Sequence, residues 1–395
     1  MDYNRLHRTL ISLQKLASWR WWQVSIVLLL LALSGGLAVG GVVADARWGA
    51  AAGVGLLLFM LLDGALLGAL PRLHLSFGPL QPPLLALAVL RWSICLILTP
   101  LLVLLLNLWP LAVITALQFM LTALIIYGCM VEPSRLTLTR LEVSQARLAG
   151  MSRPVRILHL TDLHMERPTP RDRKVLELAA DLSPDLILLT GDYLNLSYAD
   201  DDTAVAHARD WLTRLDAPLG VFGVLGTPEV DLRQRAGDVF AGTRVRWLRN
   251  EAVRVEVAGQ AIFLVGVTCD RDPQADSAAL DAVLRGLPED SYTILMYHTP
   301  DLMPEAAQRG IGLYVAGHTH GGQWRLPFYG AVLTSSVYGK RYEMGHYVQG
   351  ATELYVSRGL GMEGLAAPRA RFICPPEAVL LMLLPSGRSE QRGEK

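Results

Sequence analysis

The sequence predicts a bundle of about four transmembrane helices followed by a layered α/β domain. Long runs before residue 131 contain almost no charge, and each is close to the roughly 20 residues that cross a bilayer. After residue 132, short apolar runs alternate with helical segments, a pattern typical of layered α/β packing. The polar tail over 386–395 is expected to be disordered.

Charge and cysteine content give no support to several classes of protein. The formal net charge of zero averages a nearly uncharged first part and a charged remainder, so it is uninformative as an average; it gives no support to nucleic-acid binding, and no nucleic-acid partner is expected. The four cysteines are scattered without a Cys-x-x-Cys spacing, which indicates neither a disulfide framework nor a thiolate zinc site. At this length, two structural units are expected.

Residues 1–22 predict a basic amphipathic segment at a membrane surface, because Arg and Lys side chains are interspersed with leucines. The tryptophans at 19, 21 and 22 suit the boundary between water and lipid. The transmembrane domain is predicted over 23–131. Its four spans are expected at 23–44, 49–70, 84–108 and 110–131.

The distribution of Lys and Arg predicts the orientation of these spans. Basic residues precede the first span, occur at Arg72, and follow the last span at Arg135, Arg140, Arg147 and Arg153. This bias predicts that both termini lie in the cytoplasm of a multi-pass protein of the bacterial inner membrane.

Two charged residues fall inside the predicted spans. Asp63 in the second span and Arg91 in the third lie about two helical turns from the same membrane edge. We expect them to form an ion pair, because an unpaired charge at that depth is costly. A structural clamp is the simpler interpretation, and a role in substrate binding is the alternative.

The soluble domain is predicted over 132–385 and begins with an edge strand near 136–143. Further strands are expected at 155–160, 185–190, 220–225, 261–267, 292–297, 313–316, 353–356 and 378–384. Helices are expected between them at 171–182, 203–215 and 275–286.

Potential metal ligands follow several of these strands. They are Asp162 and His164, Asp192 after Gly191, His298, and His318 with His320. Open α/β folds place their sites at such strand ends. Imidazole nitrogens combined with carboxylate oxygens suit Mn²⁺, Fe or Zn²⁺, and six ligands favour a pair of ions over one. Such a pair binds the oxygens of an in-line displacement at phosphorus.

This ordered set of motifs resembles the calcineurin-like metallophosphoesterases, over roughly residues 132–385. The matching segments are Asp162-Leu-His164, Gly191-Asp192, His298 in Tyr-His-Thr-Pro, and Gly317-His318-Thr-His320. The bacterial membrane-associated branch is the most similar, and some of its members cleave UDP-2,3-diacylglucosamine on the way to lipid A. The resemblance implies a four-layer α/β/β/α sandwich.

The resemblance also implies roles for individual residues. Asp162, His164 and His320 would hold a first metal ion, Asp192 would bridge both ions, and His298 with His318 would hold the second. Manganese is the expected metal, with iron or zinc as alternatives.

One motif departs from the family pattern. Where the family has Gly-Asn-His followed by Glu or Asp, this chain has Gly226-Thr227-Pro228-Glu229. Thr227 would offer the second metal a shorter neutral oxygen than asparagine. Pro228 can neither protonate a leaving group nor bind phosphate. The second metal site is therefore expected to be weakened.

Several consequences of this departure remain open. Glu229 or a water molecule supplies the missing contacts, or the substrate has a good leaving group that needs no general acid. Alternatively, the domain is a metal-binding or ligand-sensing module. A mononuclear site held by Asp162, His164, Asp192 and His320 is a further alternative.

The sequence as a whole predicts a membrane-anchored metallophosphoesterase that hydrolyses a phosphoester or pyrophosphate bond. Asp192, His318 and Glu229 are the predicted catalytic residues. The expected partners are membrane lipids and an amphiphilic or lipid-linked phosphate substrate, such as a UDP-diacylglucosamine. A phosphodiesterase of broad specificity for soluble substrates is the enzymatic alternative.

Overall fold

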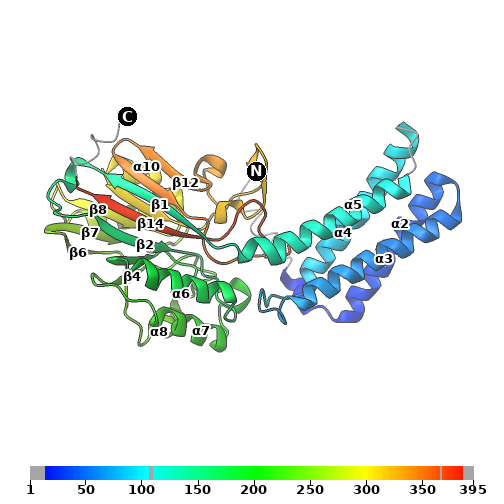
Figure 1. Ribbon diagram of the computed structural model, residues 1–395, viewed down its shortest axis with the longest axis horizontal. Helices are drawn as coiled ribbons and strands as arrows, with labels where there is room; N and C mark the ends of the chain where they lie inside the picture. The colour runs from blue at the N-terminus through cyan, green and yellow to red at the C-terminus, as the bar shows by residue number, and fades with distance from the viewer. Residues whose placement is uncertain (1–13, 106–109, 365–366, 386–395) are drawn as a thin grey trace. The chain divides into compact units, whose positions relative to one another are not determined.

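A computed structural model describes residues 14–105, 110–364 and 367–385 (Figure 1). The chain divides into two compact units. The first comprises Met1–Val131 with Gly364–Ala370, and the second comprises Glu132–Glu363 with Arg371–Lys395. Each unit is described separately below.

The first unit is a helical bundle. Its helices are α2 (Trp21–Val43), α3 (Ala46–Ala69), α4 (Gln81–Pro100) and α5 (Pro110–Ile126). Five-residue π-helical segments continue α4 and α5, at Leu101–Leu105 and Tyr127–Val131. Within the described residues, four helices are long and apolar enough to cross a membrane, which confirms the predicted number.

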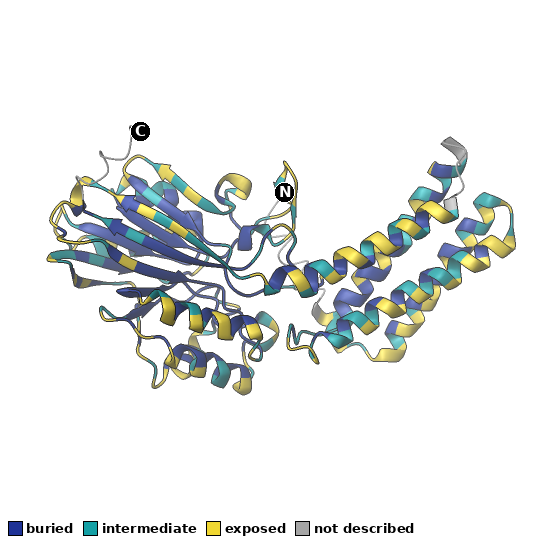
Figure 2. Cartoon of the chain, viewed as in Figure 1, coloured by how far each residue is buried: buried dark blue, intermediate teal, exposed yellow. Residues whose placement is uncertain are grey.

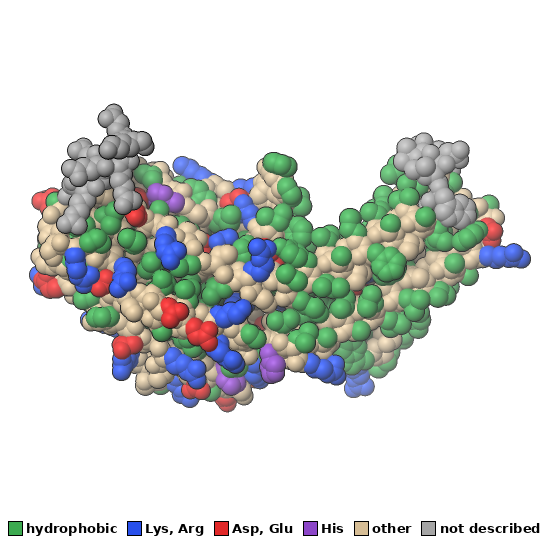
Figure 3. All heavy atoms as spheres, in the orientation of Figure 1, with side chains coloured by type: hydrophobic (Ala, Val, Ile, Leu, Met, Phe, Trp, Pro, Cys, Tyr) green, Lys and Arg blue, Asp and Glu red, His purple; other side chains and the backbone are tan. Residues whose placement is uncertain are grey.

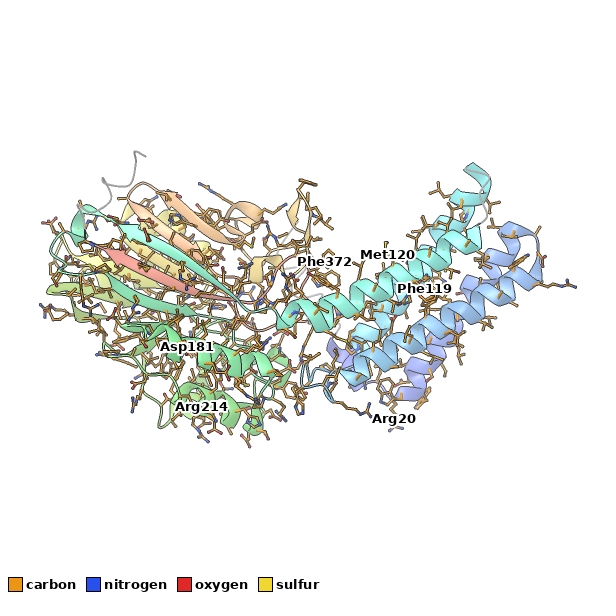
Figure 4. The ribbon with its side chains drawn as sticks, in the orientation of Figure 1. Arg20, Phe119, Met120, Asp181, Arg214 and Phe372 are labelled. Carbon is orange, nitrogen blue, oxygen red and sulfur yellow. The ribbon has the colours of Figure 1, made fainter. Side chains whose placement is uncertain are left out.

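The outside of this bundle is apolar. Exposed residues cover its helices (Figure 2), and their side chains are mostly hydrophobic (Figure 3). Phe119 and Met120 on α5 are examples, with 61% and 54% of their surface exposed (Figure 4). An apolar exterior of this kind fits lipid rather than water as the surrounding solvent.

Small residues let α2 and α3 approach closely. A side chain at Gly36 would come within 2.7 Å of the Gly49 carbonyl oxygen, so this crossing requires glycine. The connection between the helices is short: Ala44 ends α2 in a left-handed conformation, and Asp45 caps α3 by accepting a hydrogen bond from the Arg47 amide.

The N-terminal segment differs from its prediction. Residues 1–13 lie outside the described part of the chain, and Gln14–Ser18 form a short 3-10 helix. Trp21 and Trp22, expected in the interfacial segment, are instead the first residues of α2. An uninterrupted apolar sequence follows them, so helix formation extends back to the tryptophans.

The predicted pair of Asp63 and Arg91 is confirmed. Both side chains are fully buried, and Arg91 donates to the two carboxylate oxygens of Asp63 at 2.6 Å each. Gln118 and Thr122 on α5 accept the remaining guanidinium hydrogen bonds. All five guanidinium N–H groups therefore have an acceptor. A set of partners that is complete without any ligand supports the structural interpretation of this clamp.

The second unit is a sandwich of two six-stranded sheets. The first sheet has the order β1-β14-β2-β3-β4-β5 and the second the order β12-β13-β9-β8-β7-β6. The first contains β1 (Thr137–Ser144), β14 (Glu377–Leu384), β2 (Val155–Leu160), β3 (Leu186–Leu189), β4 (Val221–Gly223) and β5 (Val245–Trp247). The second contains β12 (Gly345–Gln349), β13 (Thr352–Val356), β9 (Leu313–Ala316), β8 (Tyr292–Met296), β7 (Gln260–Gly266) and β6 (Glu251–Val257).

Helices cover the outer face of each sheet, which confirms the predicted four layers. Helices α6 (Pro170–Leu182), α7 (Asp202–Thr213) and α8 (Arg233–Phe240) pack on the first sheet. Helices α9 (Pro273–Leu284) and α10 (Met303–Gln308) pack on the second. Alternate residues of the central strands face the helices or the opposite sheet, which produces three apolar layers.

The strands that the sequence did not predict are edge strands and a small hairpin. Strands β5, β6 and β12 each end a sheet, and each mixes polar with apolar residues. An edge strand of mixed polarity lacks the continuous apolar run of a central strand. The hairpin of β10 (Arg325–Leu326) and β11 (Gly330–Ala331) is too short to show a period, as are helices α8 and α10.

Candidate metal centre

The predicted ligands meet where parallel strands of both sheets end. Asp162 and His164 follow β2, Asp192 follows the neighbouring β3, His298 follows β8, and the Gly317–His320 segment follows β9. Backbone hydrogen bonds join the loops within each sheet: the Asp162 amide donates to the Gly191 carbonyl, and the Gly317 amide donates to the His298 carbonyl. Between the sheets, the His318 amide donates to the Asp162 carboxylate at 3.0 Å.

Six side chains form two buried clusters, Asp162 with His164 and His320, and Asp192 with His298 and His318. In each cluster, the potential ligand atoms lie within 4.8 Å of one another. The structure therefore brings together all six predicted side chains, in the two groups expected for a binuclear centre.

Facing imidazole nitrogens show that the first cluster fits a cation. His164 Nε2 and His320 Nε2 are 3.0 Å apart. Nδ1 of His164 lies 3.2 Å from the Leu194 carbonyl oxygen, which can only accept a hydrogen bond. That contact assigns the proton to Nδ1, so the lone pair of Nε2 faces the cluster.

The second cluster is arranged in the same way. His298 Nδ1 lies 2.7 Å from the Thr190 carbonyl oxygen, which directs the lone pair of Nε2 toward His318 Nδ1, 3.1 Å away. Asp192 lies between the clusters, with Oδ2 3.6 Å from His164 Nε2 and Oδ1 3.2 Å from His298 Nε2. A carboxylate with one oxygen toward each cluster suits a bridging ligand.

The backbone at this site is strained. Asp162, His164, Asp192, His318 and His320 all have positive φ angles, between 46° and 69°. This left-handed region is uncommon for residues other than glycine, and it concentrates at functional sites. Five such residues in one centre indicate that side-chain placement is maintained at the expense of backbone energy.

Burial and neighbouring charges set the protonation of these groups. Burial lowers the pKa of His318, and the charges of His298 and Arg271 lower it further. Burial also lowers the pKa of His320, which keeps both imidazoles neutral. Burial opposes ionisation of Asp192, but the surrounding histidines overcome this and lower its pKa. Burial lowers the pKa of His298, but the charge of Asp192 and the hydrogen bond to it outweigh burial and raise this pKa to about 9. His318 and His320 are therefore in the neutral form that binds metal ions, whereas His298 must lose a proton when an ion binds.

The divergent Gly226–Glu229 loop contacts the second cluster. The Thr227 amide donates to Asp192 Oδ1 at 2.6 Å, and its hydroxyl oxygen lies 3.2 Å from His298 Nε2 and 3.4 Å from His318 Nδ1. A side chain at Gly226 would overlap the Asp192 carboxylate, so glycine is required for this approach. The Thr227 hydroxyl therefore lies among the candidate ligand atoms.

The next two residues of this loop lie farther out. Pro228 is half-buried and offers no polar side-chain atom. The Glu229 side chain is 45% exposed, and one of its oxygens is 3.6 Å from an Arg271 nitrogen. Glu229, predicted as catalytic, thus faces a cation at the edge of the site.

Three residues of the site have no signal in the sequence. Asp231 accepts hydrogen bonds from the amides of Asp192, Tyr193 and Gly226, at 2.7 to 2.8 Å. Glu363 lies 3.4 Å from His164 Nδ1, and Arg271 faces Glu229. Each is a single charged residue in a loop, without a motif or period that distinguishes it from a solvated side chain.

Basic residues near the chain's C-terminus have structural partners. Arg358 binds Glu377 at 2.9 Å, and Arg325 binds Glu343 at 2.8 Å. The fully buried Arg371 donates to backbone carbonyls, including that of Gly361 at 2.6 Å.

Comparison with known proteins agrees with this geometry. Residues 155–322 match the protein family described as calcineurin-like phosphoesterase. The uncharacterized metallophosphoesterase YkuE of Bacillus subtilis (strain 168) is 29% identical over 65% of this chain and 88% of its own length. The phosphodiesterase YaeI of Escherichia coli (strain K12) is 28% identical over 58% of this chain and 83% of its own. The UDP-2,3-diacylglucosamine pyrophosphatase LpxG of Chlamydia muridarum is 24% identical over 64% of this chain and 91% of its own.

Proposed function

We propose that the second unit, whose residues 155–322 match the calcineurin-like phosphoesterase family, hydrolyses a phosphoester or pyrophosphate bond in an amphiphilic, lipid-linked substrate. The observation that carries this proposal is the pair of buried clusters with facing imidazole nitrogens.

In this proposal, Asp162, His164 and His320 would hold one divalent ion, and His298 with His318 would hold the other. Asp192 would serve both ions, which is supported by its two oxygens facing different clusters. Manganese is the proposed metal, since mixed carboxylate and imidazole ligands suit it. When bound, a metal pair lowers the pKa of a water molecule and stabilises charge on phosphoryl oxygens.

The Thr227–Glu229 segment restricts the substrates to those with a weakly basic leaving group. Thr227 offers the second ion a neutral oxygen, so we propose a weaker second site than asparagine would give. Pro228 cannot donate a proton, and general acid catalysis typically contributes about 10²–10⁴ in rate. A nucleotide phosphate leaves as a weakly basic anion and needs such a proton less than an alkoxide does. Arg271, which faces Glu229, is the proposed cation for a substrate phosphate.

The first unit supports the choice of an amphiphilic substrate. Four helices that can cross a membrane would keep the hydrolase beside lipid. The similarity to LpxG, whose name states a nucleotide-linked diacylated sugar as substrate, points to the same chemical class. We propose that the protein resides in a bacterial inner membrane with its hydrolase in the cytoplasm, on the basis of the Lys and Arg bias.

A substrate screen tests the proposal. Full-length protein, depleted of metal and reloaded with Mn²⁺, is incubated with UDP-2,3-diacylglucosamine, other nucleotide-linked lipids and a soluble aryl phosphodiester. We expect preferential release of a nucleotide from a lipid-linked substrate, and its loss in Asp192→Asn and His318→Ala. Equal activity in those variants would contradict the site assignment. Turnover of the soluble ester alone would favour the broad phosphodiesterase.

A further inference from the structure

Exposed large hydrophobic side chains of the second unit concentrate in one segment. Among its described residues nine such side chains are exposed, and eight of them lie at 324–337 or at Ile373. They are Trp324, Leu326, Phe328, Tyr329, Val332, Leu333, Val337 and Ile373, and the ninth is Val348. A clustered patch of this kind marks an interaction surface, whereas scattered exposed residues do not. We call residues 324–337 the apolar hairpin.

The base of the apolar hairpin is firmly attached to the metal-binding loop. Arg325 donates to the Gly321 carbonyl at 2.9 Å and to Glu343 at 2.8 Å, and Glu343 also accepts from the Ala331 amide at 3.2 Å. The Arg325 amide donates to the carbonyl of Phe372, which is labelled in Figure 4. Its apolar surface is therefore presented by an ordered β-turn rather than by a loose loop.

The Phe328 side chain at the tip of the hairpin does not pack against the rest of the unit. Phe328 has a relative exposure of 110% and a φ angle of +63°, which is unfavourable for a bulky residue. Strain without intramolecular packing indicates that the stabilising contact is made with something outside the unit.

One cation contacts an aromatic ring of this apolar tip, and a second follows it in the chain. The Lys340 ammonium group lies 3.5 Å from the centre of the Tyr329 ring, and Arg341 follows it in the chain. Aromatic rings next to Lys and Arg suit the interface of a bilayer, where rings enter the head-group region and cations meet anionic lipids. A protein partner would need an acidic rim to match Lys340. A bilayer is the simpler partner, because the four helices that can cross a membrane already bring the chain to lipid.

We propose that the apolar hairpin inserts its tip into the interfacial region of an anionic bilayer. The membrane helices of the same chain favour this insertion, because a tethered hairpin meets lipid at a high effective concentration. The hairpin begins four residues after His320, so its insertion would set the depth at which the metal centre meets lipid-borne phosphates. This function belongs to the surface and does not depend on the identity of the substrate.

Fluorescence from a labelled tip tests the proposal. Phe328→Cys and the control Val348→Cys are labelled with an environment-sensitive dye in full-length protein, in nanodiscs containing phosphatidylglycerol. The native cysteines at 95, 129, 269 and 374 are buried and react slowly. We expect the dye at 328 to shift to shorter wavelength, to be quenched by doxyl-labelled lipid and to be protected from iodide. The dye at 348 should show the opposite behaviour.

Two results would overturn the inference. One is equal iodide quenching at both positions in nanodiscs. The other is a dye at 328 that is protected from iodide only after a diacylated nucleotide is added, which would assign the tip to substrate binding. Retention of metal in the labelled protein verifies that the centre is intact, and a Lys340→Glu variant should reduce lipid quenching at 328.

Discussion

Replacement of Asp231 should weaken the metal centre without removing a ligand. Its carboxylate accepts three buried backbone N–H groups, from Asp192, Tyr193 and Gly226, and so fastens the Asp192 turn to the divergent loop. Burial and the charge of Asp192 raise the pKa of Asp231 to about 7, and the hydrogen bonds from the Gly226 and Tyr193 amides act in the opposite direction.

The magnitude follows from the number of donors left without an acceptor. In Asp231→Asn, one amide oxygen can serve Asp192 and Gly226, but the new NH₂ group faces the Tyr193 amide. One unsatisfied buried donor costs about 1–3 kcal/mol in the free energy of unfolding, and Asp231→Ala leaves three, for about 3–9 kcal/mol. Mutation of a residue that orients a metal ligand typically lowers metal affinity by about 10–100-fold.

Calorimetric titration with Mn²⁺ measures this effect on metal-depleted full-length protein in detergent. Asp231→Asn should bind the second ion about 10–100-fold more weakly. The control is Asp200→Asn, whose side chain is 76% exposed and which should change nothing. Wild-type affinity at both sites in Asp231→Asn would refute the claim that this carboxylate positions Asp192.

Three further predictions concern other parts of the molecule. The double variant Thr227→Asn with Pro228→His should bind the second metal ion more tightly and turn over alkyl phosphodiesters about 10²-fold or more faster. Unchanged metal affinity and unchanged rates would show that this loop does not contact the metal site. Asp63→Leu should destabilise the bundle by about 3–5 kcal/mol, while the double variant with Arg91→Met should recover most of that loss; thermal aggregation in detergent distinguishes them, and an equally unstable double variant would contradict the clamp. Burial raises the pKa of Asp276 to about 6 in the folded state. The folded state therefore binds a proton more tightly than the unfolded state does, and the free energy of unfolding decreases as pH rises from about 4 to 6. Asp276→Asn should consequently raise the thermal midpoint more at pH 7.5 than at pH 5, and an equal shift at both values would exclude the effect.

The sequence predicted the elements that have a long or repetitive pattern. The four spans are apolar all round because their outer faces suit lipid, and the central strands are apolar because both of their faces are covered, so composition alone identifies both. Strands β5, β6 and β12 escaped prediction because each is an edge strand of mixed polarity, without the continuous apolar run of a central strand. The hairpin of β10 and β11 escaped because two-residue strands carry no period.

A similar division applies to the sites. The six candidate ligands occur in short motifs directly after predicted strands. Side chains that can bind metal are thus found where α/β folds place their sites, and this coincidence identifies them. Asp231 and Glu363 act through contacts that form only in the folded chain, so no local pattern reveals them. Gln118 and Thr122 complete the Arg91 clamp as neutral side chains within an apolar span, where charge patterning is uninformative.

Metal stoichiometry tests the central claim most directly. Full-length protein is reloaded with Mn²⁺, separated from free ions by gel filtration, and analysed by inductively coupled plasma mass spectrometry. A binuclear centre predicts two ions per chain, about one in His320→Ala and in His318→Ala, and none retained stably in Asp192→Ala. Wild-type protein that binds no ion, or histidine variants that keep both, would contradict the assignment of these six residues to a metal centre.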